Sequence, residues 1–309
     1  MITASVVGVG VWLAVAAAGP GLGRRLPPAA ATRLLVLAAV VVAASTLLVG
    51  GLLAFTWLAQ LPEVVELGPW SVAMLRAGTP VPVVVAAGAT VAVAASVLHA
   101  GTVLVRRGLG WWRMRRAVDG LADAAGLIVL HDDRPDAYST PPPGGRIVVS
   151  AGLLRALEPT ERRVLLAHES SHLRHRHAWW VLAADVAAAV NPVLVPTARA
   201  VGHAVERWAD EHAAVQVGDR ALVARTLARG ALLVHTAGTT GTGARALGAV
   251  ARAVPQRVRA LLAPAPRWRP VTAAVLLGLL LVTAGAAATV QRDADEFFDH
   301  ARIADVRSP

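Results

Sequence analysis

The sequence contains no cysteine and no lysine, and it is poor in charged residues and in aromatic rings. Without cysteine there are no disulfide bonds and no thiolate metal ligands, so a metal site needs histidine and carboxylate ligands. All 30 basic residues are arginine. Only 16% of the residues are charged and 4% aromatic, whereas 55% are hydrophobic. This balance is typical of a membrane protein rather than of a soluble globular protein.

The excess of basic over acidic residues gives a formal net charge of +10. A short segment, 106–116, concentrates five arginines and two tryptophans. Basic residues with interleaved aromatic rings are one way to bind nucleic acid. This segment directly follows a long apolar run, however, and arginines beside a membrane segment face anionic lipid headgroups. We therefore expect contact with the lipid bilayer and no direct nucleic-acid binding.

Four long apolar segments are each close to the length of about 20 residues that crosses a bilayer as a helix. They lie at about 2–19, 34–59, 81–105 and 271–290. A signal peptide is the rival interpretation of the first segment, but no basic residue precedes its apolar run. The sequence therefore predicts three transmembrane helices within residues 1–105 and a fourth at 271–290.

The distribution of arginine predicts the orientation of these helices, because positively charged loops stay in the cytoplasm. The loop 20–33 holds three arginines and no acidic residue, whereas the loop 60–80 is net acidic. The N-terminus is then outside, residues 106–270 form a cytoplasmic domain, and the short tail 291–309 is outside. The prediction is a multi-pass protein of the cell membrane.

A further apolar run, 178–198, is predicted not to cross the membrane. Asp185 lies within it and would cost about 3 kcal/mol near the bilayer centre. A crossing would also export the eleven arginines from Arg199 to Arg269. Two interpretations remain for this run: a hydrophobic hairpin that re-enters the cytoplasmic leaflet, or a buried core helix of the cytoplasmic domain.

Short β-branched runs predict a small sheet in the first part of the domain at 106–270. Residues 127–131 and 146–149 are predicted strands, and 136–140 is a candidate third strand. Tyr138 and the strand 146–149 are candidates for a sheet edge that pairs with an extended peptide. The predicted fold is mainly α, a polytopic membrane protein with four transmembrane helices and a cytoplasmic α+β domain.

A five-residue pattern after this sheet carries the chemistry. It is His168-Glu169-Ser170-Ser171-His172, or HExxH. Histidines four residues apart lie one turn apart on the same face of a helix and can bind one metal ion. Glu169 lies beside them, where a carboxylate can act as a general base toward water. About one chain in a hundred of this composition contains the pattern by chance, so the pattern alone does not establish a metal site. A third ligand elsewhere in the sequence would support it.

Catalytic zinc takes three protein ligands and leaves one position for water. The acidic residues after His172 include Glu206 and Asp210, which lie four residues apart and therefore on one helical face. We predict that Glu206 binds zinc, while Asp210 accepts a hydrogen bond from a ligand histidine and fixes its tautomer. Glu211 is the competing ligand, although it lies well round the helix from Glu206. The alternative is a solvated acidic helix face.

The HExxH pattern, the preceding segment 147–154 and the segment 206–210 (ERWAD) together resemble membrane-embedded gluzincin zinc peptidases. Two families fit: metallopeptidase family 56, of the β-lactam-responsive antirepressor type, and the related family 48 of CAAX-prenyl and heat-shock membrane peptidases. The best-known antirepressor proteins carry a large external sensor, whereas only 291–309 remain here, so antibiotic sensing is not expected. The resemblance implies a zincin-like domain with one zinc ion per chain. It carries over the three ligands, the base and the outer acid, which are His168, His172, Glu206, Glu169 and Asp210.

The predicted function is zinc-dependent hydrolysis of peptide bonds in a cytoplasmic or membrane-proximal protein. By resemblance, a transcriptional repressor is the first candidate substrate and a damaged membrane protein the second. His203, one turn before Glu206, is a candidate to polarise the substrate carbonyl. The alternative from another class is a non-catalytic membrane receptor or scaffold that binds a regulatory partner. Its zinc would be structural, with His175 or His203 as fourth ligand.

Overall fold

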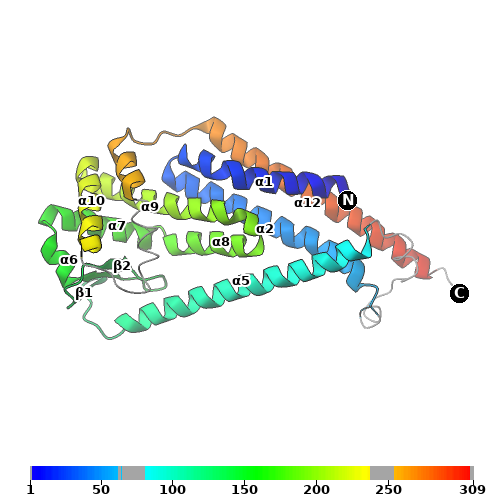
Figure 1. Cartoon of the computed structure of the whole chain (residues 1–309), viewed down its shortest axis with the longest axis horizontal. Helices are drawn as coiled ribbons and strands as arrows, with labels where there is room; N and C mark the ends of the chain where they lie inside the picture. The colour runs from blue at the N-terminus through cyan, green and yellow to red at the C-terminus, as the bar shows by residue number, and fades with distance from the viewer. Residues whose placement is uncertain (1, 62–63, 65–80, 237–253, 307–309) are drawn as a thin grey trace.

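The computed structural model describes residues 2–61, 64, 81–236 and 254–306. Helices dominate it, and one small sheet lies at one end (Figure 1). Within the described residues four helices are long and apolar enough to cross a membrane, which confirms the four transmembrane helices that the sequence predicts. They are α1 (Ile2–Arg24), α2 (Pro28–Leu58), α5 (Val83–Val118) and α12 (Pro270–Val306).

Two of these helices continue well beyond their apolar segments. α5 runs unbroken from the apolar part through the arginine-rich segment to Val118, because arginine, leucine and methionine favour a helix and no proline interrupts it. α12 runs on to Val306, so most of the predicted polar tail is helical. Both termini lie at the end of the molecule opposite the sheet (Figure 1).

The sheet has three strands in the order β1 (Leu127–Leu130), β3 (Ile147–Ser150), β2 (Ala137–Ser139). β1 pairs parallel with β3, and β2 pairs antiparallel with it. The sequence offered the strand 146–149 as a candidate edge, and this is wrong because β3 is the central strand. Its Val148 is fully buried. The edge nearest the HExxH helix is instead β2.

The HExxH segment lies in the helix α7 (Pro159–Arg174), which follows the short helix α6 (Ala151–Ala156). The sequence fixes the start of α7 by a capping box between Glu158 and Glu161 and by a proline in the first turn. Its end is less regular. Arg176 takes a left-handed conformation with φ 52°, which turns the chain back at once into the next helix.

The apolar run at 178–198 forms a helical hairpin. Its first arm, α8 (His177–Val190), has 14 residues, too few for the ~20 that cross a bilayer. A 3₁₀ turn, η1 (Pro192–Leu194), follows, and α9 (Val195–Val217) returns. This geometry is that of a non-spanning element, and the depth of the hairpin in the bilayer stays a prediction.

Polar contacts hold the hairpin among the transmembrane helices. At its tip, the Asn191 amide donates to Thr46 of α2 over 2.9 Å and accepts from the Val193 backbone N–H over 3.1 Å. The end of α8 packs in one apolar cluster with residues of α1, α2, α5 and α12. Asp185 of α8 pairs with Arg107 of α5. An acidic residue in this apolar run is therefore balanced by a cation from a neighbouring helix.

Beyond the sheet, the domain is completed by α10 (Arg220–Thr236) and by a short helix over residues 254–262. These two helices pack on α7 and α9 through small and branched side chains. The cluster consists of Val164, Ala213, Ala214, Val223, Ala224 and Leu261. Through this cluster, α10 and the 254–262 helix hold α7 and α9 against each other.

Candidate metal centre

Two helices bring the predicted ligands together. α7 places His168 and His172 one turn apart, with their Nε2 atoms separated by 3.2 Å. α9 crosses beside α7 and places Glu206 opposite them, with Oε2 3.7 Å from His168 Nε2 and Oε1 3.8 Å from His172 Nε2. One donor atom from each of the three residues lies within 4.8 Å of the others. Two imidazoles and one carboxylate at this spacing fit a zinc ion with an open fourth position.

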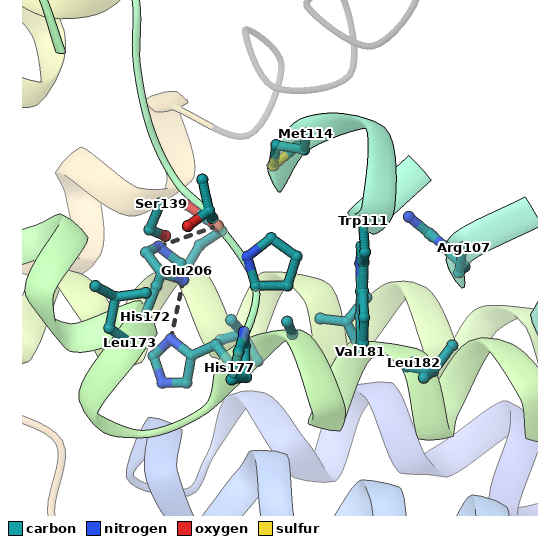
Figure 2. A pocket seen from close by; sticks show the side chains of 15 residues that line it. Arg107, Trp111, Met114, Ser139, His172, Leu173, His177, Val181, Leu182 and Glu206 are labelled. Carbon is teal, nitrogen blue, oxygen red and sulfur yellow. Dashed lines mark hydrogen bonds and ion pairs between the residues drawn. The ribbon is translucent and has the colours of Figure 1, made fainter. Parts of the chain in front are cut away.

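The outward nitrogen of each ligand histidine also has a partner. His168 Nδ1 donates to Asp210 Oδ1 over 3.1 Å, and the Asp210 side chain is only 4% exposed. His172 Nδ1 lies 3.0 Å from His177 Nδ1. Figure 2 shows His172 between Glu206 and His177, with both contacts drawn. Both rings therefore present Nε2 toward the centre, as the tautomers of a metal site require.

His177 is a site residue that the sequence did not assign. It is 1% exposed, and its ring packs on His172 and on Trp208 of α9. It reaches His172 only because the chain reverses at Arg176, where a residue other than glycine adopts positive φ. No helical spacing rule relates a residue across such a turn, so the sequence carries no signal for this contact.

Glu169 is buried beneath the edge strand β2. Its exposure is 9%, and burial raises the pKa of its carboxyl, while the His168 ring and a hydrogen bond with Ser139 oppose that rise. A carboxylate whose pKa lies above the ordinary value is a better proton acceptor near neutral pH. The position next to both ligand histidines and the raised pKa suit the role of base that the sequence predicts.

The charges of the metal-free centre are strongly coupled. Burial lowers the pKa of His168, but hydrogen bonds to Asp210 and Glu206 outweigh it and raise the pKa to about 10. Burial lowers the pKa of His172 to about 4. Burial raises the pKa of Glu206, but His168 and the guanidinium of Arg257 outweigh it and hold the pKa well below the ordinary value. The protein without metal thus keeps two ionised acids beside one protonated histidine.

Arg257 is the second residue that sequence reasoning missed. It comes from the 254–262 helix and is 7% exposed. Its guanidinium donates to both carboxylate oxygens of Asp210, over 2.8 and 2.6 Å, and lies 3.0 Å from Glu206 Oε2. Arg257 is one of the eleven arginines from Arg199 to Arg269, and nothing in the local sequence distinguishes it from the others.

The competing candidates lie elsewhere. Glu211 pairs with Arg220, outside the group of three donors. His203 is exposed and does not line the cavity beside the centre, so its contact with a substrate stays a prediction. His175 stacks on Trp208 at a ring separation of 4.6 Å. Among the described residues, neither His175 nor His203 joins the group as a fourth donor.

A cavity of about 240 Å³ opens beside His172 and Glu206. One wall is the part of α5 that follows its apolar segment, and the others are the end of β2 with its following prolines and the first turns of α8. Figure 2 shows Trp111 and Met114 of α5 facing the centre across this space. Trp111 also contacts Trp179 of α8 edge to face, with ring centroids 5.0 Å apart. The cavity thus lies where α5 passes from apolar to basic sequence.

Comparison with known proteins finds similarity over this part of the chain. Residues 115–226 match peptidase family M48. Three curated relatives are named protease HtpX homologs. The one from Thermoplasma acidophilum is 49% identical over 59 residues, which is 18% of this chain and 19% of the relative. The one from Acidiphilium cryptum is 42% identical over 71 residues, which is 21% and 25%. The one from Aeropyrum pernix is 35% identical over 118 residues, which is 35% and 37%.

The chain therefore matches between about a fifth and just over a third of the length of these relatives. No solved structure gives a significant match. Of the two families that the sequence resembles, the comparisons support M48, and the resemblance to a membrane zinc metallopeptidase is confirmed. The matched segment contains the sheet, α7, α8 and the acidic pair of α9, whereas Arg257 lies outside it.

We expect Glu206→Ala to weaken zinc binding roughly 100-fold or more, because the substitution removes one of the three ligands. Glu211→Ala is the matched control: it removes a carboxylate from the same helix that pairs with Arg220 instead. The zinc content of the purified chains, measured by atomic absorption, distinguishes the two. Loss of zinc in Glu211→Ala together with retention in Glu206→Ala would show that the ligand is misassigned.

Zinc binding near pH 7 should release about one proton. His168, with its pKa raised to about 10, is protonated in the metal-free chain and must lose that proton, whereas His172, with a pKa of about 4, is already neutral. The affinity should therefore fall about tenfold for each unit by which the pH drops below the pKa of His168, which is about 10. Calorimetry in buffers of different ionisation enthalpy counts the proton. An affinity independent of pH between about 6 and 9 contradicts the expectation.

Proposed function

From the match of residues 115–226 to peptidase family M48 and from the geometry of the centre, we propose that the chain is a zinc-dependent membrane metalloendopeptidase. The observation that carries the proposal is the open set of three donors, His168, His172 and Glu206, beside a buried carboxylate and a cavity. Each donor residue also contacts a further residue that orients it: Asp210 for His168, His177 for His172 and Arg257 for Glu206. Such outer partners are typical of metal sites.

In the proposed mechanism, different residues of the chain have different roles in hydrolysis. His168, His172 and Glu206 would hold one zinc ion, which would supply a water of lowered pKa and a positive charge near the scissile carbonyl. Glu169 accepts the proton of the attacking water and passes it to the nitrogen of the leaving amine. Asp210 and His177 keep the ligand rings in the required tautomer throughout.

The edge strand β2 offers a way to hold an extended substrate. The Asp136 carbonyl accepts a backbone hydrogen bond from Ser150 of β3, and the Thr140 N–H donates to Arg146, just before β3. The backbone groups of Tyr138 between them therefore also face β3. The backbone groups of Ala137 and Ser139 then point away from the sheet. A peptide that pairs with this edge would pass directly over Glu169, which is bonded to Ser139.

The non-catalytic receptor with a structural zinc is the second candidate function. It requires a closed site with a fourth protein ligand. Because neither His175 nor His203 lies in the donor group, and because a cavity adjoins the ligands, the structure favours the peptidase. The names of the relatives likewise support a protease.

The proposed substrate is a protein segment close to the membrane surface. The cavity is bounded by α5 just beyond its apolar part and by the start of the hairpin, so a bound chain lies beside the bilayer rather than far from it. The relatives' names give no support for a transcriptional repressor, and we do not extend the proposal to one. We also propose that the bilayer is the chain's other partner and that it binds no nucleic acid directly.

We further propose that the metal centre faces the cytoplasm, with both termini outside. The loop 20–33 and the arginines 106–116 lie at the same end of the bundle as the sheet, and the termini lie at the other. This arrangement agrees with the rule that positively charged loops stay in the cytoplasm.

Glu169→Gln should keep zinc and lose cleavage by about 10³-fold, because the amide cannot accept the proton of water. Ser170→Ala, on the adjacent residue of the same helix, is the matched control and should cleave normally. The measurement is the hydrolysis of an unfolded protein substrate by the full chain in detergent, alongside its zinc content. Undiminished cleavage by Glu169→Gln would refute the mechanism.

The cysteine-free sequence allows a direct test of orientation. Arg292→Cys, on the exposed part of α12, should react with a membrane-impermeant maleimide in intact cells. Val215→Cys, on a side chain 80% exposed in α9, should react only after the membrane is permeabilised. The opposite labelling pattern would invert the proposed topology.

A further inference from the structure

We infer that Arg257 is a positioning residue that holds two of the three metal ligands in place. This inference rests on the proposed function, because it assumes that His168 and Glu206 bind the metal. Arg257 lies outside the segment that matches peptidase family M48, on the 254–262 helix. The centre is therefore completed by a part of the chain that the family match does not cover.

Every nitrogen of the guanidinium has a carboxylate partner. Nε and Nη2 form a fork on the two oxygens of Asp210, at 2.8 and 2.6 Å, and Nη1 lies 3.0 Å from Glu206 Oε2. The Arg257 side chain is 8% exposed, so water does not replace these contacts. A planar, bidentate arginine contact fixes direction as well as charge.

The contacts reach ligands on two different helices. Through Asp210, Arg257 acts on His168 of α7, because the same Asp210 oxygen that meets Nη2 also accepts the hydrogen bond from His168 Nδ1. Directly, it acts on Glu206 of α9. Arg257 contacts the Oε2 atom of Glu206, and the Oε1 atom of Glu206 is directed toward His172. One side chain thus relates the orientations of the imidazole and the carboxylate.

The helix that carries Arg257 is itself anchored. Arg220 of α10 donates to the backbone oxygens of Ala260, Leu261 and Ala263 over 2.9, 3.0 and 3.2 Å, which satisfies the C-terminal carbonyls of that helix. Leu261 packs in the cluster that joins α7, α9 and α10. Arg257 therefore approaches the ligands from a fixed backbone, as a positioning role demands.

Two effects of Arg257 on metal affinity oppose each other. Its positive charge repels a divalent cation, whereas its hydrogen bonds orient the ligands. The guanidinium is paired with the carboxylates of Asp210 and Glu206, whose negative charges weaken this repulsion. Without the fork, Asp210, which is 3% exposed, loses two of its three hydrogen bonds and is free to turn away from His168. We therefore expect the orienting effect to prevail.

The test measures zinc affinity of the full chain in detergent, by competition with a chelator and with Zn²⁺ alone as the probe. Arg257→Met should bind zinc about 10–100-fold more weakly, the range found when an outer partner of a ligand is lost. Arg257→Lys keeps the charge without the fork, and should remain about 10-fold weaker than wild type. Arg229→Met is the matched control: it removes an arginine paired with Glu161 over 3.0 Å, away from the centre, and should bind zinc normally.

A second readout separates positioning from simple stability. The visible spectrum of the Co²⁺-loaded chain should change in Arg257→Met and Arg257→Lys but not in Arg229→Met, because it reports ligand geometry. If Arg257→Met does not fold, Arg257→Lys alone carries the test. Wild-type affinity and an unchanged spectrum in Arg257→Lys and in any folded Arg257→Met, with only a lower unfolding temperature, would overturn the inference. A wild-type chain that binds zinc and cleaves nothing would defeat the proposed peptidase and leave this inference standing.

Discussion

The reversal of the chain at Asn191 is the constraint on which the centre depends. α8 enters the bundle of transmembrane helices, and α9 leaves it on the same side, so the candidate ligands on α7 and α9 meet. Had the run continued across the membrane, Glu206 would lie on the opposite face from His168 and His172. The tip is stabilised by the hydrogen bond from Asn191 to Thr46 and by the side-chain cap on η1. Two partly buried hydrogen bonds of Asn191 thus stabilise the turn from which α9 runs back.

The parts of the site that follow helical periodicity could be predicted from the sequence. His168 and His172, and likewise Glu206 and Asp210, are related by a spacing of four within one helix, and each pair does share a face of its helix in the structure. Because the run 178–198 was predicted not to cross the membrane, the helix with the two histidines and the helix with the two acidic residues were expected on the same side of the membrane. The four transmembrane helices followed in the same way from length and hydropathy.

The parts that depend on turns and on distant packing could not be predicted. His177 contacts His172 across a reversal made by a left-handed arginine, and Arg257 arrives from a helix more than forty residues beyond Asp210. The sequence also could not predict that β3 is the central strand, because a run such as Ile147–Ser150 can occur at the edge or in the middle of a sheet. In each case the deciding contact is tertiary and leaves no periodic pattern in the chain.

The cavity is lined partly by residues inside the segment that matches family M48 and partly by residues outside it. The candidate ligands, the candidate base and the strand β2 lie within the segment 115–226 that matches family M48. The wall opposite them is built by Arg107, Trp111 and Met114 of α5, which precede that segment. Arg107 pairs with Asp185 and Trp111 contacts Trp179, so this wall packs against α8. A substrate of the proposed peptidase would meet the candidate reacting groups on one side and residues outside the family match on the other. For this reason the relatives support the proposed reaction more than they indicate its substrate.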